Sequence, residues 1–360
     1  MYPALAVARA LRDARPELEI DYVGGVRGLE QRIVGGSLPY HQLVVRSLRG
    51  VERDVHLVLD PLRLGASVPQ AVLLLRRLRP AAVFSSGGYL GIPLVMAARA
   101  LRIPSLVWEG NVVPGRATAA VGRIASRVAV SFPPTLSRFA ANGFVSGTPI
   151  RSLSGVDRGA ARRGFGVEDG DRLLLVFGGS QAVTRLTEAL STALDGLLPD
   201  WHVLHIAGDT GLAAANEVRD RLPVELRARY HPVGFLTDAM ADALVAADLV
   251  LGRAGSSTCA EVTAAGVASI LVPYPYAGGH QRANAAWLAD QGAAVQVPDD
   301  ELDGPRLLVE ASRLRDDEAR SRVADAAGRL GRPEAATILA EELLAMAEGR
   351  PLPSAAGAAG

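Results

Sequence analysis

Several classes of protein are excluded by what this sequence of 360 residues lacks. It has one cysteine, Cys259, so no internal disulfide can form, and the chain fits a reducing compartment. No apolar run approaches the ~18 residues that a helix needs to cross a bilayer. The formal net charge is zero, which argues against nucleic-acid binding through bulk electrostatics. We therefore expect a cytoplasmic protein, soluble or peripheral at a membrane, with no nucleic-acid partner.

The sequence also lacks the motifs of several enzyme classes. No spacing of histidines, cysteines or carboxylates suggests a metal site. The chain has no lysine at all, and therefore no Walker lysine, and it has neither G-x-S-x-G nor the dinucleotide-binding G-x-G-x-x-G. These absences weaken the hydrolase, NTPase and dehydrogenase interpretations and predict neither a metal nor a cofactor. We expect Cys259 to be a small buried side chain rather than a reactive thiol.

Apolar segments alternate with helical patterns along the whole chain. Apolar residues make up 49% and charged residues 21%, so a chain of this length can bury two cores. The alternation predicts an α/β fold with parallel sheets flanked by helices. The predicted strands are residues 18–23, 81–85, 106–109, 128–132, 173–177, 203–207, 249–251 and 269–272.

The glycine and proline of residues 145–151, Val-Ser-Gly-Thr-Pro-Ile-Arg, are typical of a crossover between domains. We therefore expect two Rossmann-like domains, residues 1–150 and 151–332, that face each other across a cleft, with the site at the carboxyl ends of the strands. A last amphipathic helix, residues 334–347, is expected to pack back on the first domain. The small-residue tail, 351–360, is expected to be disordered.

The segment from Asp248 to Asn284 carries the strongest functional signal. An apolar strand leads into the turn Ala254-Gly-Ser-Ser-Thr258, and a helix with Glu261 follows directly. Main-chain N–H groups at a helix start hold phosphate well, and Glu261 is placed to accept hydrogen bonds from sugar hydroxyls. The next strand and loop lead to His280, Gln281 and Asn284, and the last two share one helix face. Two such loops at neighbouring strand ends predict a nucleotide-sugar site.

Five further features allow a structural and a functional interpretation. Gly178-Gly-Ser180 after an apolar strand is either a phosphate-binding loop or a tight turn, and Gly87-Gly88 is a similar turn. Arg151 either reaches an anion or lies on the solvated surface. Glu109 and Asn111 end a strand, where polar side chains line a site or cap the next helix. Residues 71–79, with clustered leucines and arginines, are either a half-buried helix or a contact with anionic lipid.

Taken in order, these blocks resemble the MurG-type glycosyltransferases over nearly the full length. The matching blocks are Pro3 to Val7, Arg27-Gly-Leu-Glu30, Leu48-Arg-Gly50, Gly87-Gly-Tyr89, Glu109-x-Asn111, Gly147-x-Pro-x-Arg151, Gly178-Gly-Ser-Gln181, Arg253 to Glu261 and His280-Gln-x-x-Asn-Ala285. The resemblance implies a GT-B fold. It also implies inverting, metal-independent transfer of N-acetylglucosamine from UDP-N-acetylglucosamine to undecaprenyl-pyrophosphoryl-MurNAc-pentapeptide (lipid I, which becomes lipid II) in peptidoglycan synthesis. The expected place of work is the cytoplasmic side of the cell membrane.

The resemblance also implies a role for particular residues. The implied roles are diphosphate binding by Ser180, Ser256, Ser257 and Thr258 with Arg151 nearby, ribose binding by Glu261, uracil recognition by the main chain at Leu236, sugar binding by Gln281 and Asn284, and a position on the acceptor side for Asn111. No catalytic residue is assigned, because the family's candidate base is a histidine whose position would precede Met1.

The sequence departs from the family pattern at three places. The block His-Glu-Gln-Asn reads Trp108-Glu-Gly-Asn111, and a glycine after Gln181 is replaced by Ala182. The family's first strand and glycine turn would precede Met1, so we expect a truncated gene model rather than a shortened enzyme. The departures keep two alternatives open. One is a GT-B transferase with another lipid or natural-product acceptor, and the other is a non-catalytic nucleotide-sugar-binding relative.

Overall fold

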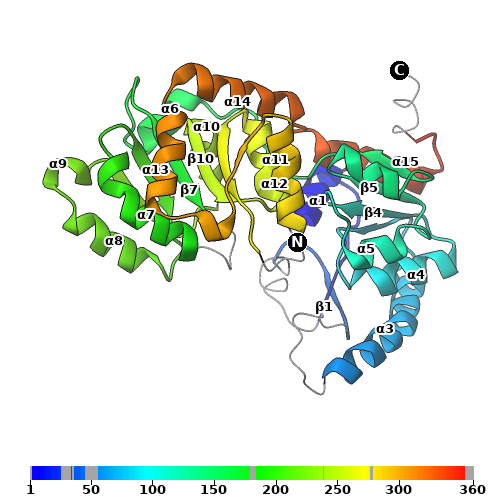
Figure 1. Ribbon diagram of the computed structural model, residues 1–360. Helices are drawn as coiled ribbons and strands as arrows, with labels where there is room; N and C mark the ends of the chain where they lie inside the picture. Colours follow the sequence, from blue (N-terminus) through cyan, green and yellow to red (C-terminus); the bar gives the residue numbers. More distant parts are fainter. Residues whose placement is uncertain are drawn as a thin grey trace. The chain divides into compact units, whose positions relative to one another are not determined.

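The chain forms two compact α/β units in a computed structural model (Figure 1). The structure describes residues 2–25, 34, 36–44, 56–178, 184–237, 239–275 and 279–352, without the side chains of residues 56–63. One unit consists of Met1–Ile150 and Glu334–Gly360, and the other of Arg151–Pro333. The strands in both units pair in parallel, so the predicted fold class is confirmed.

The first unit contains a four-stranded parallel sheet in the order β3-β4-β5-β6 and a parallel pair of β1 and β2. Every residue of β4 is buried, which is typical of a parallel strand covered on both faces. The strands are β1 (Tyr22–Gly25), β2 (Tyr40–Leu43), β3 (Val83–Ser85), β4 (Ser105–Glu109), β5 (Arg127–Val130) and β6 (Gly143–Val145).

The final helix belongs to this first unit, where it packs against the first helix. Arg127 of β5 donates to Glu342 over 3.0 Å, and the Glu342 side chain is fully buried, so this ion pair fixes the helix on the sheet. The helices of the unit are α1 (Tyr2–Ala14), α3 (His56–Leu78), α4 (Gly91–Leu101), α5 (Arg116–Val121), a 3-10 helix (Pro133–Arg138) and α15 (Ala335–Glu348).

The second unit contains a six-stranded parallel sheet in the order β12-β11-β10-β7-β8-β9. Strand β10 lies between β7 and β11, with Leu249 opposite both Leu174 and Ala268. The strands are β7 (Leu173–Phe177), β8 (His202–Ile206), β9 (Tyr230–Val233), β10 (Leu249–Arg253), β11 (Ala268–Val272) and β12 (Val295–Gln296).

Helices cover both faces of this sheet (Figure 1). Because side chains alternate along a strand, Leu174 and Val176 pack with α7 and α13, whereas Leu173 and Leu175 pack with α6, α10 and α11. The helices are α6 (Arg158–Gly164), α7 (Thr184–Leu197), α8 (Leu212–Arg221), α9 (Val224–Arg227), α10 (Met240–Ala246), α11 (Ser256–Ala265), α12 (His280–Asp290), a 3-10 helix (Asp299–Glu301), α13 (Gly304–Arg313) and α14 (Asp317–Leu330).

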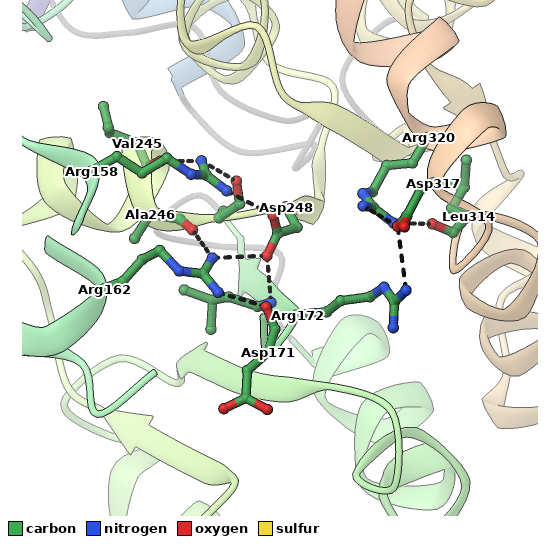
Figure 2. A network of polar contacts seen from close by, with 12 residues as sticks. Arg158, Arg162, Asp171, Arg172, Val245, Ala246, Asp248, Leu314, Asp317 and Arg320 are labelled. Atoms are coloured by element: carbon green, nitrogen blue, oxygen red, sulfur yellow. Dashed lines mark hydrogen bonds and ion pairs between the residues drawn. The ribbon is translucent and has the colours of Figure 1, made fainter. Parts of the chain in front are cut away.

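An arginine–aspartate network lies at the amino ends of β7 and β10 (Figure 2). Asp248, directly before β10, accepts hydrogen bonds from Arg158 over 2.7 Å and from Arg162 over 2.9 Å. It also accepts from the main-chain N–H of Leu173 over 2.8 Å. The carboxylate of Asp248 therefore connects α6, β7 and β10 at the amino ends of these strands, on the side of the sheet away from the candidate site.

The predicted strands from residue 81 onward are found, most with their bounds shifted by one or two residues. The strand expected at 18–23 is a correction: it begins only at Tyr22, because the exposed charged side chains of Glu17 and Glu19 precede it in an open segment. Four short strands were not predicted, namely β2, β6, β9 and β12. The tail from residue 353, expected to be disordered, lies outside the described residues.

Candidate functional site

The turn between β10 and α11 is the core of the candidate site. Ala254 is buried, Gly255 is extended at φ −66° and ψ 154°, and α11 begins at Ser256. No side chain caps the start of this helix. Its first N–H groups and the positive end of the helix dipole therefore favour an anion, and the half-exposed Ser256 and Ser257 add hydroxyl donors.

Helix α12 supports this turn through two side-chain amides. Asn284 is fully buried, and its Nδ2 donates to the carbonyl of Ala254 over 3.1 Å. Gln281 Oε1 accepts from the N–H of Tyr274 over 2.9 Å. A Cβ added to Gly255 would lie 4.0 Å from Gln281 Nε2, so this amide also lies beside the turn. Gln281 and Asn284 thus converge on the β10–α11 turn, as their spacing predicts.

Glu261 lies one turn into α11 and is 7% exposed. Burial raises the pKa of this carboxyl, and the charge and hydrogen bond of Arg151 lower it. Arg151 Nε lies 3.3 Å from Glu261 Oε1, and its Nη1 donates to the carbonyl of Thr237 over 2.6 Å. Arg151 is therefore paired with a carboxylate and a carbonyl, and the interpretation of this residue as a solvated surface side chain does not hold.

Leu236, the residue expected to recognise uracil through its main chain, follows β9 at the carboxyl end of the strand. Its side chain packs partly buried against the hydrophobic core of the sheet. The next residue, Thr237, accepts the hydrogen bond from Arg151. Arg151 therefore connects the segment around Leu236 to the carboxylate of Glu261 on α11.

Arg253 is a site residue to which the sequence reasoning gave no role. It ends β10, is 4% exposed, and forms an ion pair with Asp299. Its guanidinium lies over the ring of Tyr274 at 5.5 Å and donates to the carbonyl of Val272 over 3.3 Å. Arg253 thereby fixes the loop around Tyr274, whose main-chain N–H bonds to Gln281. The available signal was a charged residue at the end of an otherwise apolar strand.

Ser180 and the Gly-Gly-Ser-Gln loop that contains it lie outside the described residues. Strand β7 ends at Phe177, and Gly178 is the last residue described before this loop. The roles expected of Ser180 therefore stay predictions, as does the effect of Ala182.

In the first unit, Glu109 organises the loop at the end of β4. Its buried carboxylate accepts from Asn111 N and Asn111 Nδ2, each over 3.0 Å, and from Gly115 N over 2.9 Å. The interpretation of Asn111 as a helix cap is wrong, because α5 begins only at Arg116 with Gly115 in the cap position. Glu109 instead gathers the N–H groups of the loop.

Trp108 turns into the core of the first unit and is 5% exposed. Its indole N–H donates to the carbonyl of Gly147 over 3.0 Å, and its ring packs with Val7 and Leu339. The nearby turn at Gly87 and Gly88 has φ of +83° and +77°, which favours glycine. The buried indole and the glycine turn therefore both fit a structural role, namely the packing of the loops at the carboxyl ends of β3 and β4.

Cys259 and His205 are both buried in the second unit. Burial raises the pKa of the Cys259 thiol to about 12, so the sulfur stays protonated and unreactive, as expected. Burial lowers the pKa of His205 to about 4, and this ring bonds to Tyr230 Oη over 2.9 Å. Within the part of the chain that the structure describes, no group of three histidine, cysteine or acidic side chains could hold a metal ion.

The two parallel-sheet units, with a helix start and polar loops at the carboxyl ends of one sheet, define a protein of the two-domain nucleotide-sugar-binding type. Residues 1–130 match the Glycosyltransferase family 28 N-terminal domain, and residues 173–337 match its C-terminal domain. The chain belongs to glycosyltransferase family 28. The resemblance to MurG-type transferases and the GT-B fold expected from the sequence are thereby confirmed.

Individual relatives agree with this assignment. The chain is 35% identical over 351 residues to the UDP-N-acetylglucosamine–N-acetylmuramyl-(pentapeptide) pyrophosphoryl-undecaprenol N-acetylglucosamine transferase of Desulforudis audaxviator, with 93% of this chain and 92% of that protein covered. It is 36% identical to the protein of the same name from Moorella thermoacetica, with 97% and 96% covered. The crystal structure of Acinetobacter baumannii MurG is similar at a TM-score of 0.77 and 29% identity, with 95% of each chain covered.

Proposed function

We propose that this chain transfers N-acetylglucosamine from UDP-N-acetylglucosamine to undecaprenyl-pyrophosphoryl-MurNAc-pentapeptide, with inversion at the anomeric carbon. The relatives described above carry the name of this activity. The observation that carries the proposal is the buried carboxylate of Glu261 one turn behind the uncapped start of α11. This arrangement offers an anion site and a hydroxyl acceptor on the same helix, as the binding of a nucleoside diphosphate requires.

Each part of the donor has a complementary group. The start of α11 with Ser256, Ser257 and Thr258, together with Ser180, receives the diphosphate. Glu261 accepts from the ribose hydroxyls, and the main chain at Leu236 pairs with the uracil edge. Gln281 binds the hydroxyls of the transferred sugar, whereas the side chain of Asn284 is fully buried and acts on the sugar through the turn that it holds. Each of these two amides also bonds to a loop of the site, so they position the turn as well as the sugar.

The chemistry follows from these positions. The acceptor hydroxyl attacks the anomeric carbon from the face opposite the diphosphate, the glycosidic bond to UDP breaks, and negative charge develops on the leaving phosphate. Main-chain N–H groups and hydroxyls at the helix start stabilise that charge. The proton of the acceptor hydroxyl passes to a general base, to which we assign no residue.

Asn111 lies on the acceptor side in this proposal, in the loop that Glu109 holds. The interpretation in favour of a different acceptor depended partly on Trp108. The buried position of that side chain removes this argument, because the indole cannot contact an acceptor from the core. The lipid-linked muramyl pentapeptide therefore stays the favoured acceptor.

We also propose that the enzyme works as a peripheral protein at the cytoplasmic face of the cell membrane. None of the helices in the described part of the chain is long and apolar enough to span a bilayer. On α3, Ala71 and Leu75 face the core, whereas Leu73 is 67% exposed beside the exposed Arg76 and Arg77. An exposed leucine flanked by arginines supports contact with anionic lipid.

Transfer of labelled N-acetylglucosamine to the muramyl-pentapeptide lipid by the purified protein tests the activity. Replacing Glu261 by alanine is expected to weaken UDP binding by about 1.5–3 kcal/mol, because a charged acceptor is lost. Glu310→Ala is a matched control, because Glu310 is equally exposed at 7% and also pairs with an arginine, but lies on α13. Turnover on another acceptor only, or unchanged UDP affinity in Glu261→Ala, would contradict the proposal.

A further inference from the structure

Arg151 connects two segments that the proposed function assigns to the nucleoside. Its Nε lies 3.3 Å from Glu261 Oε1, and its Nη1 donates to Thr237 O over 2.6 Å. Thr237 directly follows Leu236, the proposed uracil contact. Both partners thus belong to the uridine half of the site, and neither belongs to the turn at residues 256–258 that is proposed to hold the diphosphate.

Resting on the proposed ribose role of Glu261, we infer that Arg151 is a positioning residue that fixes the place and the charge of the Glu261 carboxylate for uridine, rather than a ligand of the diphosphate. The guanidinium is planar and donates in two directions at once, so one side chain can set the distance between the ribose acceptor and the uracil-binding segment. A lysine at this position would supply the charge without this two-sided geometry.

The charge environment of Glu261 is consistent with this role. Burial in α11 raises the pKa of the carboxyl, and Arg151 is the charged group that lowers it. The elements packed against α11 carry other charged and titratable groups. These are Asp242 on α10, Arg253 at the end of β10, His280, Arg282 and Asp290 on α12, and Asp317, Glu318, Arg320, Arg322, Asp325 and Arg329 on α14. None of these described groups shifts the pKa of Glu261.

Removal of Arg151 should therefore make uridine binding sensitive to pH. Without the guanidinium, burial alone acts on the carboxyl, and its pKa rises further. The carboxyl then takes up a proton at a higher pH than in the wild type. A protonated carboxyl is a weaker acceptor for the ribose hydroxyls, so the affinity for uridine should fall as the pH is lowered.

The experiment compares uridine with UDP, because uridine has no phosphate. Affinities for both are measured by titration from about pH 5 to about pH 8 in the wild type, Arg151→Met and Arg151→Lys. In Arg151→Met we expect weaker uridine binding throughout and an additional loss of ~10-fold towards the acid end, which corresponds to one pKa unit. Arg151→Lys keeps the positive charge but loses the two-sided geometry, so we expect the wild-type pH profile with reduced affinity for uridine. This variant still tests the inference if Arg151→Met does not fold.

Arg172→Met is a matched control. Arg172 is 31% exposed and pairs with Asp317 at 3.3 Å, whereas Arg151 is 33% exposed and pairs with Glu261 at the same distance. Arg172 lies at the amino end of β7, so its replacement should leave both affinities and their pH profiles unchanged.

Three results would overturn the inference. Arg151→Met could bind uridine like the wild type but UDP more weakly, which would assign Arg151 to the diphosphate. It could lose uridine affinity equally at every pH, which would remove the charge role. Arg151→Lys could show the same pH shift as the methionine variant. Failure of the proposed function is distinguishable, because Glu261→Gln would then bind uridine and UDP like the wild type.

Discussion

Asn284 Nδ2 donates to the main-chain carbonyl of Ala254 over 3.1 Å, which bonds helix α12 to the turn before α11. Both residues are fully buried, so water cannot replace this bond if it is lost. The proposed sugar-binding helix and the proposed phosphate-binding turn are therefore one structural unit. Substitutions in α12 should therefore change the conformation of the turn before α11.

Replacing Asn284 by alanine is expected to lower the free energy of unfolding by about 1–3 kcal/mol, because the carbonyl of Ala254 is left without this partner in a buried place. UDP-N-acetylglucosamine affinity should fall with it. Urea unfolding and calorimetric titration measure the two effects. Asn216→Ala, on α8, is the control and should change neither. An Asn284 variant with native stability would show that the bond does not support the turn.

The sequence predicted the central strands well because burial leaves a clear signal in them. Leu173 to Phe177 is apolar at every position, since the strand is covered on both faces. Strand β9 reads Tyr-His-Pro-Val, and β12 has two residues, Val295 and Gln296. Both lie at the edges of the sheet, where one neighbour is missing and polar residues or proline are tolerated. Such strands lack the pattern on which prediction depends.

The candidate site was predictable only in part. Spacing within one helix placed Gln281 and Asn284 together, because residues three apart share a face. The ion pair of Arg151 with Glu261 joins residues 110 positions apart, and no spacing rule reaches that far. The role of Glu109 was missed for a different reason. The loop that follows it folds back, and only the structure brings Gly115 N onto its carboxylate.

Glu261→Gln should raise the stability of the protein near neutral pH. Burial raises the pKa of Glu261, so the native state holds this proton more tightly than the unfolded chain does. Stability is therefore lost as the pH rises from the ordinary pKa of a glutamate through the raised value. Glutamine carries no charge and still accepts from Arg151. We expect a higher melting temperature at pH 7, with the difference shrinking towards acid pH, and a constant difference at every pH would contradict this account.

Asp248→Ala should destabilise the second unit by about 3 kcal/mol, because it leaves the buried guanidinium of Arg162 without its carboxylate. Asp317→Ala is the comparison. Asp317 also pairs with two arginines in the same network, but its side chain is 70% exposed, so little change is expected. Figure 2 shows both aspartates, and chemical unfolding of the two variants measures the contrast. Equal losses would mean that burial does not decide the strength of these pairs.

His205 should make the protein sensitive to acid. Burial lowers the pKa of its ring from 6.5 to about 4, so the unfolded chain takes up this proton before the native state does. Stability is present above about pH 6.5 and is lost as the pH falls towards about 4, in total by about 3 kcal/mol. His205→Gln should remove this part of the pH dependence, which urea titrations at several pH values can measure. A variant with the wild-type slope would assign the acid sensitivity to other groups.

Glu109→Gln should separate acceptor binding from donor binding, if Asn111 lies on the acceptor side as proposed. Glu109 Oε1 accepts two hydrogen bonds from Asn111, and Oε2 accepts one from Gly115 N. Glutamine has one oxygen, so its NH2 group must face an N–H donor on one of the two sides. We expect a loss of about 1–3 kcal/mol in stability and a displaced loop between residues 111 and 115.

In steady-state kinetics, KM for the lipid-linked acceptor should then rise while KM for UDP-N-acetylglucosamine stays unchanged, because the loop lies in the first unit and the proposed donor residues lie in the second. Thr135 provides a second, independent test of the same loop. Its hydroxyl donates to the carbonyls of Asn111 and Val112, so replacing it changes the loop while Glu109 stays intact. Thr135→Val should reproduce the rise in acceptor KM through the same loop. A rise in donor KM in both variants would instead place this loop in contact with the nucleotide sugar.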